Sequence, residues 1–103
     1  MGEPMSWRKA NALVNALSRR GVQLDLEGNR IRVLQGAVTA KDRDAVDTLR
    51  PWILCGIEIG RLLSTLQRTL SVEEMSRIDD LATAGDIANL RLVGLRLKEE
   101  ASP

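Results

Sequence analysis

Few side chains in this sequence are of the types that perform acid–base, nucleophilic or metal chemistry. The 103 residues include no histidine and a single cysteine, Cys55, so neither a histidine-activated nucleophile nor a His/Cys metal site can form. Adjacent carboxylates occur at Glu73/Glu74 and Asp79/Asp80, but neighbouring helical residues point to different faces, so these pairs are expected to be solvated. No glycine-rich phosphate loop is present. We therefore predict no catalytic residues, no metal site and no cofactor.

Basic residues are the remaining candidates for binding chemistry. Fifteen Lys and Arg against fourteen Asp and Glu give a net charge of +1, which provides no overall attraction to nucleic acid. The main interpretation of these residues is ordinary solvated charge. Because only Trp7 and Trp52 are available to stack on bases, an acidic peptide is the stronger of the two binding alternatives and nucleic acid the weaker. The basic residues concerned flank the first expected helix and line the second expected strand: Arg8, Lys9, Arg19, Arg20, Arg30 and Arg32.

The N-terminal region has the pattern of an amphipathic helix over residues 7–20. Ser6 is expected to cap its start, and Gly21 to supply the left-handed residue that ends it. One apolar stripe recurs at helical spacing and should face the core: Ala10, Leu13, Val14 and Leu17.

A β-hairpin is predicted directly after this helix. Apolar and polar residues alternate over residues 22–26 and again over residues 30–34, and Gly28-Asn29 between them is a turn signal. In the second strand, Ile31 and Val33 are expected to point inward, and Arg30 and Arg32 outward.

Four more helices are expected after the hairpin. Thr39 with Asp42 marks the start of a helix that ends near Leu49, and Pro51 begins a third helix that runs to about Thr69. Ser71-Val72-Glu73-Glu74 is a capping box for a helix over residues 72–83. Asp86 is expected to start the last helix, although residues 90–97 partly alternate as a strand would. The predicted fold class is α+β: a helix, a hairpin and two helices (residues 1–70), then a helical extension (residues 71–103).

The third helix carries residues that suit an interface. Gly56 and Gly60 lie one turn apart and allow the close approach of another backbone, within the fold or across a dimer that would include Trp52. Cys55 lies in an apolar run and is expected to be buried. The lone cysteine and the lack of a long apolar segment indicate a cytoplasmic protein without a membrane span.

Five segments within residues 7–66 carry a resemblance to a known family: Leu13–Leu17, Arg20-Gly21-Val22-Gln23-Leu24, Glu27–Arg32, Gly36-Ala37-Val38-Thr39 and Leu49–Leu54. These segments and the order of the elements resemble the N-terminal docking domains of the TubC type, which begin nonribosomal peptide synthetase subunits. The resemblance implies a homodimer whose second strand accepts a short acidic peptide as an added strand. By position, the docking edge would be Arg30, Ile31, Arg32, Val33 and Leu34. In a departure from the family, a helical tail rather than a synthetase module is expected after this region.

Two functions of different kinds follow from these patterns. The first is a non-catalytic docking or adaptor module that dimerises and binds a partner peptide along Arg30–Leu34. The second is a small accessory or inhibitory protein of a phage or plasmid that acts on a larger protein complex. A nucleic-acid-binding regulator is a third, weaker hypothesis.

Overall fold

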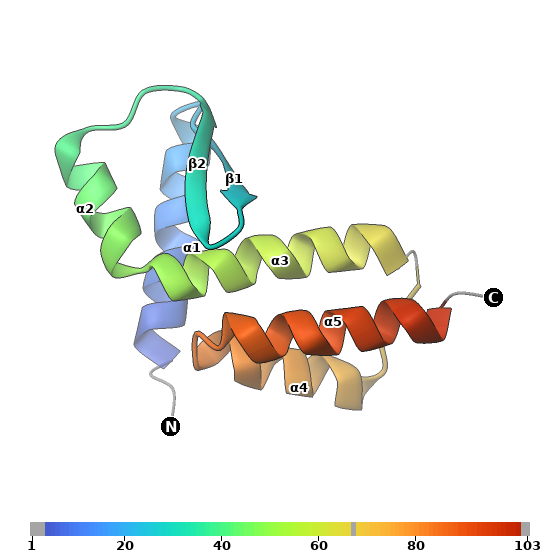
Figure 1. The fold of residues 1–103 in the computed structure, drawn as a ribbon. Helices are drawn as coiled ribbons and strands as arrows, with labels where there is room; N and C mark the ends of the chain where they lie inside the picture. The colour runs from blue at the N-terminus through green and yellow to red at the C-terminus, as the bar shows by residue number, and fades with distance from the viewer. Residues whose placement is uncertain (1–3, 67, 102–103) are drawn as a thin grey trace.

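The fold was analysed on a computed structural model, which describes residues 4–66 and 68–101. A helix and a two-stranded antiparallel hairpin are followed by four further helices, so the predicted order of elements is confirmed (Figure 1). None of the described helices combines the length and the apolar character that crossing a membrane requires. The elements are α1 (Pro4–Arg19), β1 (Gln23–Glu27), β2 (Arg30–Gln35), α2 (Ala40–Thr48), α3 (Arg50–Leu66), α4 (Val72–Thr83) and α5 (Ile87–Ala101).

Helix α3 is the element on which the others are assembled. The chain reverses direction between α3 and α4 and again between α4 and α5, so α5 runs alongside α3 (Figure 1). Helix α1 packs on α3, and β1 of the hairpin also contacts α3. The residues of the expected helical extension therefore pack on the same helix as the N-terminal residues.

The main core lies between α3, α4 and α5. Cys55 and Ile78 have no exposed surface, and Leu90 is 1% exposed. Burial of this apolar surface is the dominant stabilising contribution to the fold. The core cluster consists of Cys55, Leu62 and Leu66 of α3, the connector residue Leu70, Ile78 and Ala82 of α4, and Leu90 and Leu97 of α5. A further set of buried residues comes from α1, α3 and the start of the hairpin: Ala10, Leu17, Val22, Ile53 and Leu54.

Local capping signals account for most helix starts. The capping boxes Thr39/Asp42 and Ser71/Glu74 are both present, and the backbone N–H of Asn89 donates to the Asp86 carboxylate. The prediction that Ser6 caps α1 is wrong, because the helix already begins at Pro4. Proline is favoured at the first helical position, where no backbone N–H is needed for the helix ladder.

The helical interpretation of residues 90–97 is confirmed and the strand alternative is wrong, because α5 continues without interruption to Ala101. Leu90 and Leu97 share the buried side of that helix, as helical spacing requires. Helix α3 ends at Leu66, earlier than the predicted Thr69, and α2 is separated from α3 by Leu49 alone.

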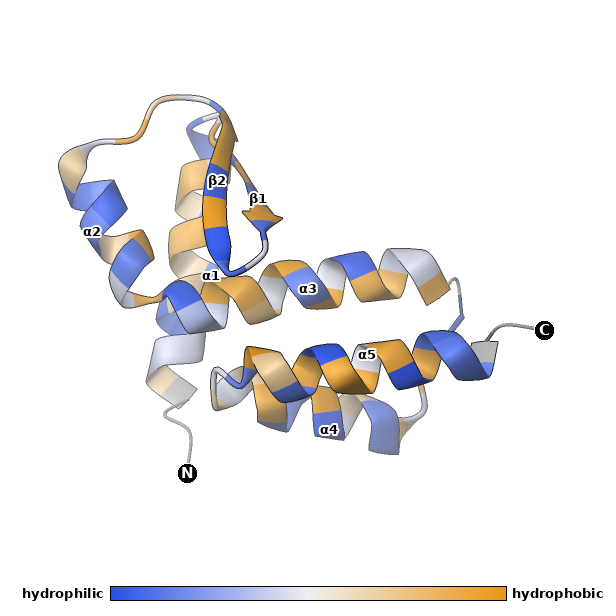
Figure 2. Cartoon of the chain, viewed as in Figure 1, coloured by the Kyte–Doolittle hydropathy of each residue, from blue (hydrophilic) through white to orange (hydrophobic). Residues whose placement is uncertain are grey.

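The hairpin has one apolar and one polar face. Leu24 pairs with Val33 and Leu26 with Ile31, so these four side chains share a face, while Asp25, Glu27, Arg30 and Arg32 share the other. The predicted alternation is therefore correct, and it is visible along β2 in Figure 2. Val33 is nevertheless 41% exposed, so its end of the apolar face is only partly covered.

Candidate functional site

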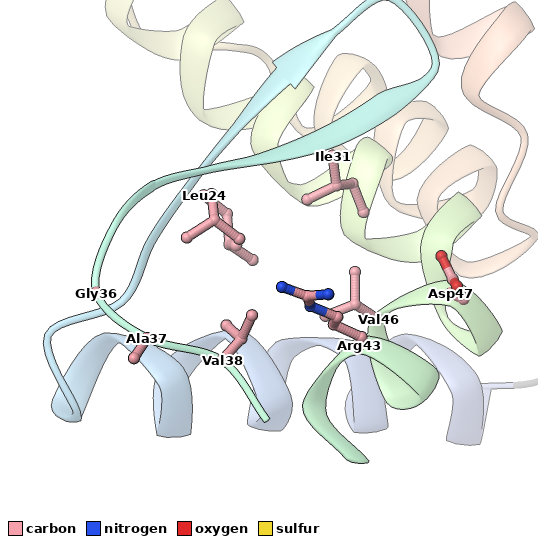
Figure 3. Close-up of a pocket in the computed structure, with 9 residues that line it drawn as sticks. Leu24, Ile31, Gly36, Ala37, Val38, Arg43, Val46 and Asp47 are labelled. Atoms are coloured by element: carbon pink, nitrogen blue, oxygen red, sulfur yellow. The ribbon is translucent and has the colours of Figure 1, made fainter. Parts of the chain in front are cut away.

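A groove of about 560 Å³ lies between the apolar face of the hairpin and α2. Leu24 and Ile31 point into it from the hairpin, and Val46 rises from α2 on the opposite side (Figure 3). Its lining residues are Leu24, Ile31, Val33, Gly36, Ala37, Val38, Arg43, Val46 and Asp47. A concave, mostly apolar surface with few polar groups is the usual form of a binding site.

The Arg43 side chain extends from α2 into this groove, with its guanidinium between the apolar walls (Figure 3). Within residues 4–66 and 68–101, this guanidinium has neither an ion pair nor a hydrogen bond. The carboxylate at the rim, Asp47, is already paired with Arg50 at 2.6 Å. The groove therefore offers an uncompensated positive charge beside apolar surface.

Helix α2 is fixed relative to α1 by an ion pair at its first turn. Both Nη atoms of Arg20 donate to the Asp42 carboxylate, at 3.1 and 2.8 Å. The same carboxylate accepts from the backbone N–H of Thr39, which closes the capping box. The Arg20 guanidinium, and then the Thr39 N–H, hold the pKa of Asp42 well below its usual range. This charged network positions the α2 wall of the groove.

Gly36 closes the end of the groove where β2 leaves the hairpin. Its φ of +93° is in the left-handed region. A β-carbon at this position would lie 2.7 Å from the Gly21 carbonyl oxygen and 2.8 Å from the Val22 α-carbon. The end of β2 thus packs against the end of α1 through backbone contact that only glycine allows.

The outer edge of β2 is the second part of the site. In the described residues the sheet contains only β1 and β2, so the backbone groups along the far edge of β2 have no ladder partner. Such an edge is a template for pairing with another extended chain. The β1 side of the hairpin is instead held against α3, where Arg61 forms an ion pair with Asp25.

The five residues expected to form the docking edge are divided between the two faces of β2. Ile31 and Val33 line the groove. Arg30 and Arg32 are exposed on the opposite face, and Arg32 makes only a 3.9 Å ion pair with Glu27. Leu34 is 53% exposed at the bulge where the register shifts. The α2 wall was not predicted from the sequence, although the apolar Val46 and Arg43, which has no charge partner among the described residues, mark it in the structure.

Two of the three residues expected at the dimer interface have partners within the chain. The Trp52 Nε1–H donates to the Thr83 carbonyl oxygen at 3.0 Å. A β-carbon at Gly56 would lie 3.7 Å from the Trp7 ring, so this glycine faces a side chain of α1. Gly60 has open space around it. The dimer therefore stays a prediction, and Gly60 is its most accessible position.

Cys55 and the carboxylates are the described side chains that could take part in covalent or metal chemistry. Burial, followed by the negative charge of Asp86, raises the pKa of the Cys55 thiol to about 11, so the thiol is protonated at neutral pH. No group of three or more His, Cys, Asp or Glu residues that could hold a metal ion occurs in the described part of the chain. The arrangement provides a groove, an unpaired strand edge and positive charge.

Comparisons of the chain with protein-family models, with curated proteins and with solved structures found no match. The resemblance to TubC-type docking domains accordingly stays a prediction.

Proposed function

We propose that this chain is a non-catalytic docking or adaptor module that binds an acidic, extended segment of a partner protein along β2. The observation that carries the proposal is the juxtaposition of the unpaired β2 edge with an apolar groove that holds the unpaired Arg43 guanidinium. The expected TubC-type resemblance supports the same function.

An added strand would obtain its affinity from backbone hydrogen bonds to β2 and its specificity from alternate side chains. Because side chains alternate across a strand, every second residue of the peptide would face the groove beside Ile31 and Val33. The intervening residues would lie on the face that carries Arg30 and Arg32. The proposed ligand therefore alternates apolar and acidic residues, with one carboxylate within reach of Arg43.

We further propose that the module is a homodimer that works in the cytoplasm. The face of α3 around Gly60 supports this assignment, because a β-carbon added at Gly60 would meet no atom of another element within 4 Å and Leu63, one turn further, is 40% exposed. A reducing cytosol also suits a chain with a single, buried cysteine.

The test uses the isotope-labelled full-length chain and a synthetic peptide that alternates valine and glutamate. We expect the peptide to perturb the backbone NMR signals of residues 30–35 and of α2. Reversal of both charges in Arg30→Glu/Arg32→Glu should weaken binding about tenfold, because two surface attractions become repulsions.

The matched control is Arg8→Glu/Arg19→Glu, which reverses two exposed charges of α1 and should leave the affinity unchanged. Circular dichroism of both variants verifies that the fold is intact. Equal binding of the peptide to the β2 variant and to the control, or signal changes away from β2 and α2, would overturn the proposed function.

A further inference from the structure

Helix α5 carries an apolar ridge on its outer side. Leu92 is 62% exposed and Leu95 is 56% exposed, although Leu90 and Leu97 of the same helix are buried. Leu92 and Leu95 are three residues apart, so they are neighbours on one face of the helix. Apolar bands are visible along the outer surface of α5 in Figure 2.

A groove of about 370 Å³ runs beside this ridge, between α4 and α5. Leu81 and Val93 form its apolar floor, and both pack against the main core. The residues that line this groove are Arg77, Leu81, Asn89, Leu92, Val93 and Arg96. Arg77, Val93 and Arg96 also line an adjoining groove, together with Glu74 and Glu100. The groove belongs to elements other than the hairpin and α2, so it is separate from the β2 site.

The two arginines of the groove lack charge partners. Within the described residues, the side chains of Arg77 and Arg96 make neither an ion pair nor a hydrogen bond. Other arginines of the same helical bundle are paired: Arg68 with Glu74 at 3.0 Å and Arg91 with Glu58 at 3.9 Å. The α4–α5 surface thus combines exposed leucines with two available guanidiniums.

We propose that the α4–α5 surface is a second docking site, which binds an amphipathic helix of a partner protein whose apolar stripe is flanked by acidic residues. Leucines at helical spacing beside a groove match the anchors at positions i, i+3, i+4 and i+7 of a helix that binds in a groove. Carboxylates on the flank of that helix would pair with Arg77 and Arg96.

The charges argue against a second copy of this chain as the occupant. In a twofold dimer the same patch lies on both subunits, so each copy would bring its own Arg77 and Arg96 to the interface. Glu74 and Glu100 lie beside these arginines in the adjoining groove, but Glu74 is already paired with Arg68, so the four guanidiniums would be only partly compensated and would repel one another. An acidic partner helix supplies the missing charge.

The test compares two stapled helical peptides with the same leucine stripe, one with glutamate flanks and one with lysine flanks. Each is titrated into the isotope-labelled full-length chain, and binding is followed by NMR. We expect the glutamate peptide to bind about tenfold more tightly than the lysine peptide, because two attractions replace two repulsions. The perturbed signals should lie in residues 77–81 and 89–96.

Arg77→Glu/Arg96→Glu should reverse this preference, whereas the control Arg8→Glu/Arg19→Glu should preserve it. If the charge reversal unfolds the chain, Arg77→Gln/Arg96→Gln removes the charge alone and should abolish the preference. Equal affinity of the two peptides for the unaltered chain, or signal changes confined to β2 and α2, would overturn the proposal. So would analytical ultracentrifugation that shows a dimer dissociated by Leu92→Ser, because the surface would then be the interface between copies.

Discussion

Arg91 of α5 holds the turn of the hairpin through Asn29, which precedes it by 62 residues. One Nη atom donates to the Asn29 side-chain oxygen and the other to the Gly28 carbonyl oxygen, both at 2.7 Å. Together with the Arg61–Asp25 ion pair, this contact attaches the polar face of the hairpin to α3 and α5. The proposed docking strand is therefore positioned by the C-terminal half of the chain.

Arg91→Ala should loosen the hairpin more than the helices. Two charge-assisted hydrogen bonds on a partly exposed side chain are lost, and we expect the free energy of unfolding to fall by about 1 kcal/mol. Amide hydrogen exchange should become faster in residues 23–35 and remain unchanged in α4. The matched control is Arg96→Ala on the same helix, whose side chain has no partner in the described residues. Equal exchange in the two variants would contradict the positioning role of Arg91.

Two glycine substitutions should change stability in opposite directions. Gly85 has a φ of +69°, and an added β-carbon would lie 3.1 Å from the Trp52 ring, so Gly85→Ala should destabilise the fold by about 1 kcal/mol or more. Gly60→Ala, in the interior of α3 with open space around it, should stabilise the fold by up to about 1 kcal/mol. Urea unfolding followed by tryptophan fluorescence measures both.

The Gly60→Ala variant also tests the proposed dimer. If a second copy approaches α3 closely at Gly60, the added methyl group should weaken dimerisation in analytical ultracentrifugation. A chain whose oligomeric state is the same with and without the methyl group would exclude a close approach at this position.

Local signals explain why most of the fold could be predicted. A capping box such as Thr39/Asp42 or Ser71/Glu74 spans only four residues, so it can be recognised in the sequence without knowing how the rest of the chain folds. The hairpin is equally local, because its turn and its alternating strands are adjacent in sequence. At the start of α1 two local signals compete, and the preference of proline for the first helical position at Pro4 prevails over the preference of serine for the cap at Ser6.

Only the β2 wall of the candidate site could be predicted from the sequence, because the second wall comes from a separate element, α2. Alternation placed Ile31 and Val33 on one face of the strand, but it could not show that Arg43 of α2 would lie opposite them. The contact of Arg91 with Asn29 likewise depends on how α5 packs on α3. Tertiary packing determines such contacts, so they cannot be predicted from periodicity or from capping signals.

Acid should destabilise the chain through Glu74. The Arg68 guanidinium, and then the Ser71 N–H, lower the pKa of Glu74 to about 2 from its ordinary value of 4.5. The unfolded chain therefore binds a proton more readily than the folded chain, and stability is lost as the pH falls from about 4.5 towards 2. Urea unfolding at a series of pH values should show a shallower decline for Glu74→Gln, which keeps a hydrogen-bonding side chain in the cap.

Glu73→Gln is the control for that series, because Glu73 is the exposed neighbour of Glu74 and lies outside the cap. This variant should retain the steep decline of the unaltered chain. A decline that is as steep in Glu74→Gln would show that other carboxylates, such as Asp42 with its lowered pKa, dominate acid unfolding.

Truncation after Leu70 should unfold the chain, even though the predicted docking domain ends there. Helices α4 and α5 contribute Ile78, Ala82, Leu90 and Leu97 to the core cluster, so their removal would expose the opposing apolar side chains of α3. The loss of Arg91 would also release the hairpin turn.

We expect the truncated chain to lose cooperative thermal unfolding in circular dichroism, whereas Leu92→Ser, which alters only the exposed ridge of α5, should retain it. A cooperative transition in the truncated chain would show that residues 1–70 fold alone, and the docking strand would then be independent of α5.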